Sequence, residues 1–205
     1  LFEANLSGAI KNAGGMLQVI NCTLVRNEGP SAYLASGGIH HRGAGGSVVN
    51  SILWGNTCPG AGGAYQAQLQ VAWGALAVSN CCVQGLGPND AQGNWDADPL
   101  FANPGLDYRL TAHSPALGAG YAGALGGAAT DLDGHARTRA GGPGSGLDAG
   151  AYQFQGTPAT PLVLKAAPQP VMACSSGDAV SFGASAGTDL SAAVDDWGFI
   201  PAQWA

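Results

Sequence analysis

Apolar and polar positions alternate in three stretches of the first half of the chain, and the pattern returns at a nearly constant interval. The stretches are residues 8–21 (GAIKNAGGMLQVIN), 37–50 (GGIHHRGAGGSVVN) and 67–80 (AQLQVAWGALAVSN). Each places an aliphatic residue eleven positions before an asparagine, with steps of 29 and 30 residues: Ile10, Ile39 and Leu69, then Asn21, Asn50 and Asn80. Alternation with a period of two predicts short strands, and a repeat of this length indicates a solenoid.

The residue types and segment lengths within each repeat indicate which kind of solenoid the chain forms. Glycine and asparagine separate the short strands, and no helix-length segment lies between them. A propeller blade would need about 40–45 residues. The pattern therefore predicts an all-β fold, a right-handed parallel β-helix whose coils stack about 4.8 Å apart. The aliphatic residues and the asparagines should each stack in register. The asparagines should form a ladder of amides at an inward corner with left-handed backbone.

Cysteine spacing adds little to this picture. The five cysteines show no CxxC pair and no zinc-finger histidine spacing, so the sequence predicts no zinc site. Cys22, Ser51 and Cys81 should form one column of small residues. Cys22 and Cys81 would lie two coils apart, about 9–10 Å, which is too far for a disulfide.

The number and placement of charged residues exclude some classes of function. Charged residues make up 10% of the chain and the net charge is −6. The seven basic residues are scattered, so no basic stripe is available to follow a nucleic-acid backbone. No apolar run reaches about 18 residues, so we expect no transmembrane helix. The chain begins with Leu1 and shows no signal peptide. We therefore expect further coils and a signal peptide upstream.

Residues 50–154 carry a series of short motifs in a fixed order. They are NSILWGN (50–56), VQG (83–85), GNWDADPLF (93–101), DYRL (107–110), SPALGAG (114–120), DLDGHAR (131–137) and LDAGAYQF (147–154). In this order they resemble the bacterial choice-of-anchor Q proteins, which are secreted or surface β-helix proteins. The resemblance covers about residues 1–155. Gly118 and Gln153 depart from it, since Asp and Glu are usual there, and both departures remove a carboxylate.

The motifs and the repeat divide the chain into four parts. Residues 1–90 should form the β-helix coils and residues 91–155 a C-terminal cap, because the end of a solenoid needs cover. Residues 156–162 (GTPATPL) have the composition of a linker. Residues 163–205 resemble the start of an immunoglobulin-like module. They are too short for a complete sandwich of about 100 residues, so we expect a truncated, partial β-sandwich-like tail.

Asp131 and Asp133 are the candidate metal ligands. The sequence DLDG resembles the opening of a calcium loop, in which alternate oxygens converge and glycine permits the turn. The glutamate of such a loop is absent, because Gly142 occupies position 12 counted from Asp131. A plain Asp–Gly turn is the alternative. No other cofactor is expected.

Two functions remain open. The first is a non-enzymatic, extracellular or cell-surface scaffold, monomeric, that contacts glycans, matrix or other cells along its flank. The second is a fragment of a polysaccharide lyase or glycoside hydrolase whose active site lies in further coils. Glycoside hydrolysis needs paired carboxylates, and residues 1–88 hold just Glu3 and Glu28. His40 and His41 are adjacent, and we interpret them as solvated or turn residues. We therefore expect no catalytic residues here.

Overall fold

The computed structural model describes residues 1–31, 35–87, 90–125, 127, 129–138 and 146–156. The chain divides into two units, Leu1–Ala159 and Thr160–Ala205. The predicted immunoglobulin-like segment, and the linker beyond residue 156, lie outside the described residues.

The first unit is all-β apart from two short helical segments. Its strands are β1 (Phe2–Glu3), β2 (Ile10–Asn12), β3 (Met16–Ile20), β4 (Thr23–Val25), β5 (Ile39–His41), β6 (Gly45–Val49), β7 (Ile52–Trp54), β8 (Leu69–Val71), β9 (Ala77–Ser79), β10 (Cys82–Val83), β11 (Phe101–Asn103) and β12 (Asp107–Leu110). The helices are α1 (Ala64–Gln68) and the 3-10 turn η1 (Ala122–Ala124). Within the described ranges, no helix combines the length and the apolar character needed to cross a membrane.

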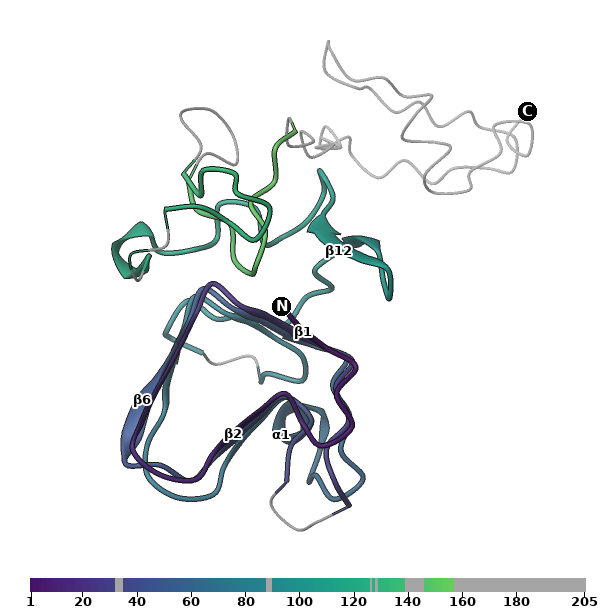
Figure 1. The fold of residues 1–205 in the computed structure, drawn as a ribbon, viewed down its shortest axis with the longest axis vertical. Helices are drawn as coiled ribbons and strands as arrows, with labels where there is room; N and C mark the ends of the chain where they lie inside the picture. The colour runs from purple at the N-terminus through teal and green to yellow at the C-terminus, as the bar shows by residue number, and fades with distance from the viewer. Residues whose placement is uncertain (32–34, 88–89, 126, 128, 139–145, 157–205) are drawn as a thin grey trace, which may run out of the picture. The chain divides into compact units, whose positions relative to one another are not determined.

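Three parallel sheets build the repeat. Their strand orders are β1-β4-β7-β10, β2-β5-β8 and β3-β6-β9, so each coil contributes one strand to each sheet (Figure 1). Ile10 pairs with Ile39 and Ile39 with Leu69. The predicted register, with steps of 29 and 30 residues, is therefore confirmed.

Inward-facing aliphatic side chains fill the space between the sheets. Ile39, Val48 and Leu53, one from each sheet of the middle coil, are fully buried in one cluster. His41 is also fully buried, because it lies two positions after Ile39 and shares its face of β5. The interpretation of His41 as a solvated or turn residue was wrong, while His40 is half-buried on the opposite face.

The predicted asparagine corner has the expected backbone. Asn21, Asn50 and Asn80 all have positive φ, between 51° and 54°. Asn50 donates through Nδ2 to Oδ1 of Asn21 at 3.2 Å, but among the described residues no side-chain hydrogen bond joins Asn50 to Asn80. Asn50 instead binds the backbone N–H and carbonyl of Tyr121. The predicted inward amide ladder is thus limited to one pair, and Asn50 turns toward a covering segment.

A second column of amides runs without interruption and was not predicted. Each member after the first accepts, on one side-chain oxygen, the backbone N–H and the side-chain amide of the member before it. The column is Asn5, Asn27, Asn56 and Gln68, with amide-to-oxygen distances of 2.8, 2.8 and 2.6 Å. The corresponding backbone N–H distances are 3.0, 3.0 and 3.1 Å. The paired bonds of this Asn5–Gln68 ladder end at Gln68, whose Nε2 donates on to Gln84 at 3.4 Å. Leu86 occupies the asparagine position of the next coil.

The C-terminal half of the described chain covers a face of one sheet, whereas the sequence predicted a cap over the end of the solenoid. Outward-facing residues of β4, β7 and β10 (Val25, Ile52 and Cys82) are buried in a second apolar cluster with residues of the C-terminal half. That half includes the antiparallel hairpin β11–β12, whose Phe101 and Tyr108 rings meet edge to face at 5.1 Å. Figure 1 shows these teal and green segments beside the sheet that contains β1. Strands β4, β7 and β10 of this sheet therefore carry buried residues on both faces, whereas Glu3 of β1 is exposed.

Candidate functional site

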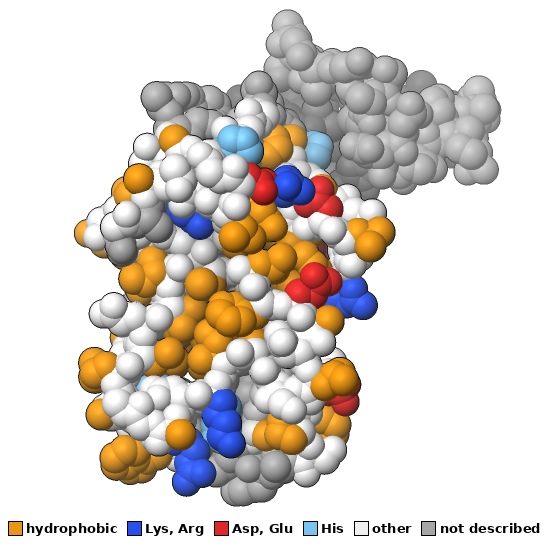
Figure 2. Space-filling view, viewed as in Figure 1, with side chains coloured by type: hydrophobic (Ala, Val, Ile, Leu, Met, Phe, Trp, Pro, Cys, Tyr) orange, Lys and Arg blue, Asp and Glu red, His pale blue; other side chains and the backbone are white. Residues whose placement is uncertain are grey.

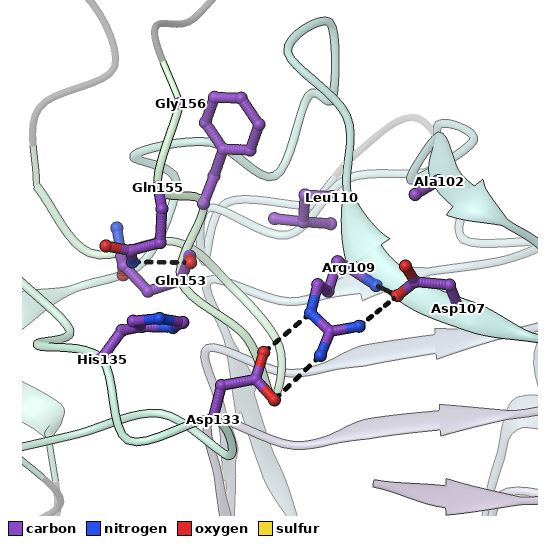
Figure 3. Close-up of a pocket in the computed structure, with 10 residues that line it drawn as sticks. Ala102, Asp107, Arg109, Leu110, Asp133, His135, Gln153, Gln155 and Gly156 are labelled. Carbon is purple, nitrogen blue, oxygen red and sulfur yellow. Dashed lines mark hydrogen bonds and ion pairs between the residues drawn. The ribbon is translucent and has the colours of Figure 1, made fainter.

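A pocket of about 390 Å³ lies in the C-terminal half, and the predicted metal ligand Asp133 lines it. Strand β12 supplies Asp107 and Arg109, the turn at residues 131–135 supplies Asp133 and His135, and residues 153–156 close the pocket (Figure 3). Asp131 lies in the same turn but is buried behind the lining. The structure thus brings both predicted aspartates to one place.

Arg109 is the central cation of the pocket. Its guanidinium bonds both carboxylate oxygens of Asp133, at 2.7 and 3.0 Å, and reaches Asp107 at 3.0 Å (Figure 3). It also lies 5.2 Å from the centre of the Tyr152 ring. Hydrogen bonding to Asp133 and then to Asp107 raises the pKa of Arg109 further above its already high value. The two carboxylates neutralise this cation, so it is poorly available to an anionic ligand.

Asp131 organises the turn that carries Asp133. Its Oδ1 accepts the backbone N–H groups of Asp133 and His135, and its Oδ2 accepts that of Gln153. Burial opposes ionisation of the carboxyl, but these N–H groups together outweigh it and lower the pKa of Asp131. The Asp131 carboxylate therefore stabilises this turn by accepting backbone N–H groups.

Among the described residues, one group could hold a metal ion, and it consists of Asp131, Asp133 and His135. Their ligand atoms all lie within 4.8 Å of one another. Two carboxylates with an imidazole suit a transition metal better than calcium, which prefers six to eight oxygens. Both oxygens of Asp131 already accept N–H groups and both oxygens of Asp133 hold Arg109, so the arrangement fits calcium poorly. Calcium binding at Asp131 and Asp133 stays a prediction.

Replacing Asp131 with asparagine should lower the free energy of unfolding by about 1–3 kcal/mol at pH 7. An asparagine amide would present N–H groups to backbone donors that now face an oxygen. The folded carboxyl has a lowered pKa, so its contribution is present above its unfolded pKa of about 3.9 and is lost as the pH falls through the folded value.

Urea unfolding at pH 7 and at pH 3 measures this effect. The difference between wild type and the Asp131→Asn variant should shrink at the lower pH. An equal difference at both pH values would contradict the assigned role of the carboxylate. Asp98→Asn, at an exposed aspartate that accepts one N–H, is the matched control and should change stability little.

The flank formed by β2, β5 and β8 is the second candidate site. Lys11, His40 and Gln70 occupy one register position on its outer side. Arg42 and Trp73 follow on the adjoining corner, where stacking continues through the bonds from Arg42 N to Asn12 O and from Ala72 N to His41 O. Trp73 is 67% exposed. We call these five residues the Lys11–Trp73 flank.

Two cations of the Lys11–Trp73 flank, Lys11 and Arg42, form no ion pair with a carboxylate among the described residues. The ion pairs of the described residues include neither Lys11 nor Arg42. Figure 2 shows lysine and arginine side chains together over β2, with no acidic side chain among them. Burial, and then the nearby Lys11 and Arg42, lower the pKa of His40, so this ring is neutral at pH 7. Sequence reasoning missed the flank, although the strand register of Lys11 and His40 was the available signal.

One ring nitrogen of His40 and one of His41 lack partners among the described residues. Asn12 lies 3.2 Å from Nδ1 of the buried His41, an arrangement that makes Nδ1 the acceptor and places the ring proton on Nε2. Nε2 of His41 and Nε2 of His40 are buried, and neither has a hydrogen-bond partner in the described part of the chain. The two rings face opposite sides of β5, so they do not combine into one ligand set.

Residues Gly118 and Gln153, the two departures from the choice-of-anchor Q pattern, both contact Asp148. The backbone N–H of Gly118 donates to Oδ1 of Asp148 at 2.7 Å, and the side-chain oxygen of Gln153 accepts the backbone N–H of Asp148 at 3.0 Å. Their side chains add no carboxylate near Asp148.

Comparison with protein-family models, with curated proteins and with solved structures finds no match for this chain.

Proposed function

We propose that the chain is a non-enzymatic scaffold, extracellular or on a cell surface, that binds glycans through the Lys11–Trp73 flank. The three parallel sheets support a right-handed parallel β-helix as its architecture, and the motif series supports membership of the choice-of-anchor Q group. The observation that carries the proposal is the exposed Trp73 beside a regular column of polar side chains.

The chemistry of the flank suits an acidic polysaccharide. An indole face offers an apolar platform for a sugar ring, and the amide of Gln70 can bond hydroxyl groups. Lys11 and Arg42 supply positive charge without a described counter-ion, in a chain whose net charge is −6. The parallel register repeats positions about every 4.8 Å along the stack, a spacing comparable to the length of one sugar unit.

The alternative, a lyase or hydrolase fragment, receives no specific support from the described residues. Glu3 and Glu28 are the acidic residues of positions 1–87. Glu3 accepts the hydroxyl of Tyr108 at 2.9 Å, and the segment of Glu28 forms a backbone bridge with Thr57. Neither lies on the Lys11–Trp73 flank.

The Trp73→Ala variant should bind a soluble polyuronate about tenfold more weakly than wild type, equivalent to about 1.4 kcal/mol. Isothermal titration calorimetry with polygalacturonate measures the effect, and a neutral β-glucan of equal length tests the charge preference. Leu106→Ala is the control, since Leu106 is 84% exposed on the β11–β12 loop.

The double variant Lys11→Ala, Arg42→Ala should lose the preference for the polyuronate and its dependence on salt. Wild-type protein that binds neither polymer would overturn the proposal. Equal losses in Trp73→Ala and Leu106→Ala would show that binding does not use the flank.

A further inference from the structure

One peptide bond, between Asp98 and Pro99, joins the coils to the segments that cover them. The described residues up to position 97 hold the three parallel sheets and the bridge to β10, and those from Pro99 onward hold the β11–β12 hairpin and the rest of the cover. This bond is also the one place in the sequence where a proline follows an aspartate. The chemistry of this residue pair therefore acts at the covalent link between coils and cover.

Both sides of this bond are anchored. On the side of the coils, Cys82 donates through Sγ to the carbonyl of Ala97 at 3.1 Å. On the side of the cover, Ser114 donates through Oγ to the carbonyl of Pro99 at 2.6 Å. Pro99 is buried, whereas Asp98 is exposed, so water reaches the Asp98 side chain. The two ends of the bond are therefore fixed while its aspartate stays open to solvent.

The carboxyl group of Asp98 is held beside its own peptide bond. Its Oδ1 accepts the backbone N–H of Leu100 at 2.9 Å, and the ring of atoms that this hydrogen bond closes contains the Asp98 carbonyl carbon and the Pro99 nitrogen. Its Oδ2 has no hydrogen-bond partner among the described residues. A reacting group that is already in place needs less loss of freedom to reach its target. The carboxyl group is thus preorganised to attack its own backbone carbonyl.

The backbone next to this bond is strained. Leu100 has a φ of 50°, in the left-handed region that leucine seldom adopts. Such a conformation persists only where the surroundings hold it in place. Here Asp98 holds the Leu100 N–H, and the N–H of Thr111 holds the Leu100 carbonyl at 3.1 Å. Breaking the Asp98–Pro99 bond releases the covalent part of this constraint.

We propose that Asp98–Pro99 is a self-cleavage site that opens in acid, and that its two products stay bound to each other. The carboxyl oxygen of Asp98 forms a bond to the Asp98 carbonyl carbon, the carboxyl proton passes to the Pro99 nitrogen, and the carbon–nitrogen bond breaks. The first product ends in a five-membered cyclic anhydride, which one water opens to restore both carboxyl groups. The second product begins with the secondary amine of Pro99.

Proline suits the leaving position. Its nitrogen belongs to a tertiary amide that carries no N–H, so no backbone hydrogen bond has to break when this nitrogen takes the proton. A carboxyl group is an established protein nucleophile. The aspartate side chain has the length that closes a five-membered ring on its own carbonyl carbon. No other reactant than water is needed.

Contacts remote from this link hold the two products together. The second apolar cluster joins Val25 and Ile52 of the coils to Phe101 of the cover. The backbone N–H of Tyr121 donates to Oδ1 of Asn50 at 2.7 Å. None of these contacts passes through the Asp98–Pro99 bond, so the cleaved protein should remain one particle with a new amino terminus at Pro99. The proposal does not depend on glycan binding.

The test compares the whole chain, folded and in urea, at the lowest pH at which its tryptophan fluorescence still matches that at pH 7. Intact mass spectrometry follows the fragments 1–98 and 99–205, whose masses add up to that of the chain plus one water. Cleavage should be about tenfold faster or more in the folded chain. Equal rates, or a faster rate in urea, would overturn the proposal, since the fold would then contribute nothing.

Two variants separate the attack by the carboxyl group from hydrolysis by solvent. Asp98→Ala should abolish cleavage at this bond. Asp98→Glu keeps a carboxyl group but must close a six-membered ring, and it should cleave about tenfold more slowly or less. The Asn103–Pro104 bond, which has no adjacent carboxyl group, should stay intact throughout. Cleavage of Asp98→Ala at the wild-type rate would contradict the mechanism.

Size-exclusion chromatography at pH 7 tests the second half of the proposal. After cleavage, both fragments should elute in one peak at the position of the intact chain, and denaturing electrophoresis should separate them. Elution of the fragments in two peaks would overturn the statement that the products stay bound.

Discussion

Replacing Asn56 with alanine should lower the free energy of unfolding by about 3 kcal/mol. Asn56 is 3% exposed and lies at the centre of the Asn5–Gln68 ladder. Its Nδ2 donates to the Leu24 carbonyl at 2.9 Å and to Gln68 at 2.6 Å. Its Oδ1 accepts two donors from Asn27. Alanine would leave several buried polar groups without a partner, and each unsatisfied group costs about 1–3 kcal/mol.

Urea unfolding followed by tryptophan fluorescence measures the loss. Asn5→Ala is the matched control, since Asn5 makes the same two bonds but lies at the exposed end of the ladder, where water replaces the lost partner. Its effect should stay below about 1 kcal/mol. Equal effects of the two substitutions would show that the ladder contributes little beyond ordinary surface hydrogen bonds.

Replacing Arg137 with methionine should also cost about 3 kcal/mol and should loosen the cover over the β1-β4-β7-β10 sheet. Arg137 is 5% exposed. Its guanidinium donates to the carbonyls of Thr130, Gly150, Asn21 and Ala151, at 3.0 to 3.4 Å. Burial lowers its pKa, and nearby carboxylates oppose that shift. Methionine keeps much of the volume but leaves buried carbonyls without donors.

The readout combines stability with local opening. Arg137→Met should unfold at lower urea, and limited proteolysis should cut residues 98–138 faster than residues 8–83. Arg42→Met is the control, since Arg42 is an exposed arginine without a described ion pair, and it should leave both measurements unchanged. A variant that is destabilised but cut no faster in residues 98–138 would contradict the role of Arg137 in holding the cover.

The repeat could be predicted because its spacing and its strand period are both local properties. A constant offset between Ile10 and Asn21, repeated in the next two coils, fixes the parallel register confirmed by the pairing of Ile10, Ile39 and Leu69. The left-handed backbone at Asn21 followed from the residue type. The hydrogen bonds of the Asn50 side chain could not be predicted in the same way, because its partner Tyr121 is 71 positions away.

The cover over one sheet was missed although a signal was present. The third strand of each coil reads TLV, ILW or CV, so its apolar residues run continuously instead of alternating. Continuous apolar strands indicate burial on both faces. The second ladder had a signal as well, since Asn27 and Asn56 each lie six positions after the corner asparagine.

In the candidate sites too, residues close in sequence could be predicted, and residues brought together by the fold could not. Asp131 and Asp133 were found because they are neighbours in sequence, and His135, two positions further, completes that series. Arg109 was missed because it reaches Asp133 from a different hairpin, 24 positions away. The Lys11–Trp73 flank joins three coils, so its members become neighbours only when the register is known.

The Asn5–Gln68 ladder also sets the unit in which a chain of this kind can change length. Each rung makes the same pair of bonds to the next, and Asn27 and Asn56 are 29 residues apart. Gain or loss of a whole repeat leaves every remaining rung with an identical neighbour, whereas a shorter insertion within a strand shifts the amides out of phase. Gain or loss of a whole repeat is therefore the change of length that keeps the amides of this ladder in phase.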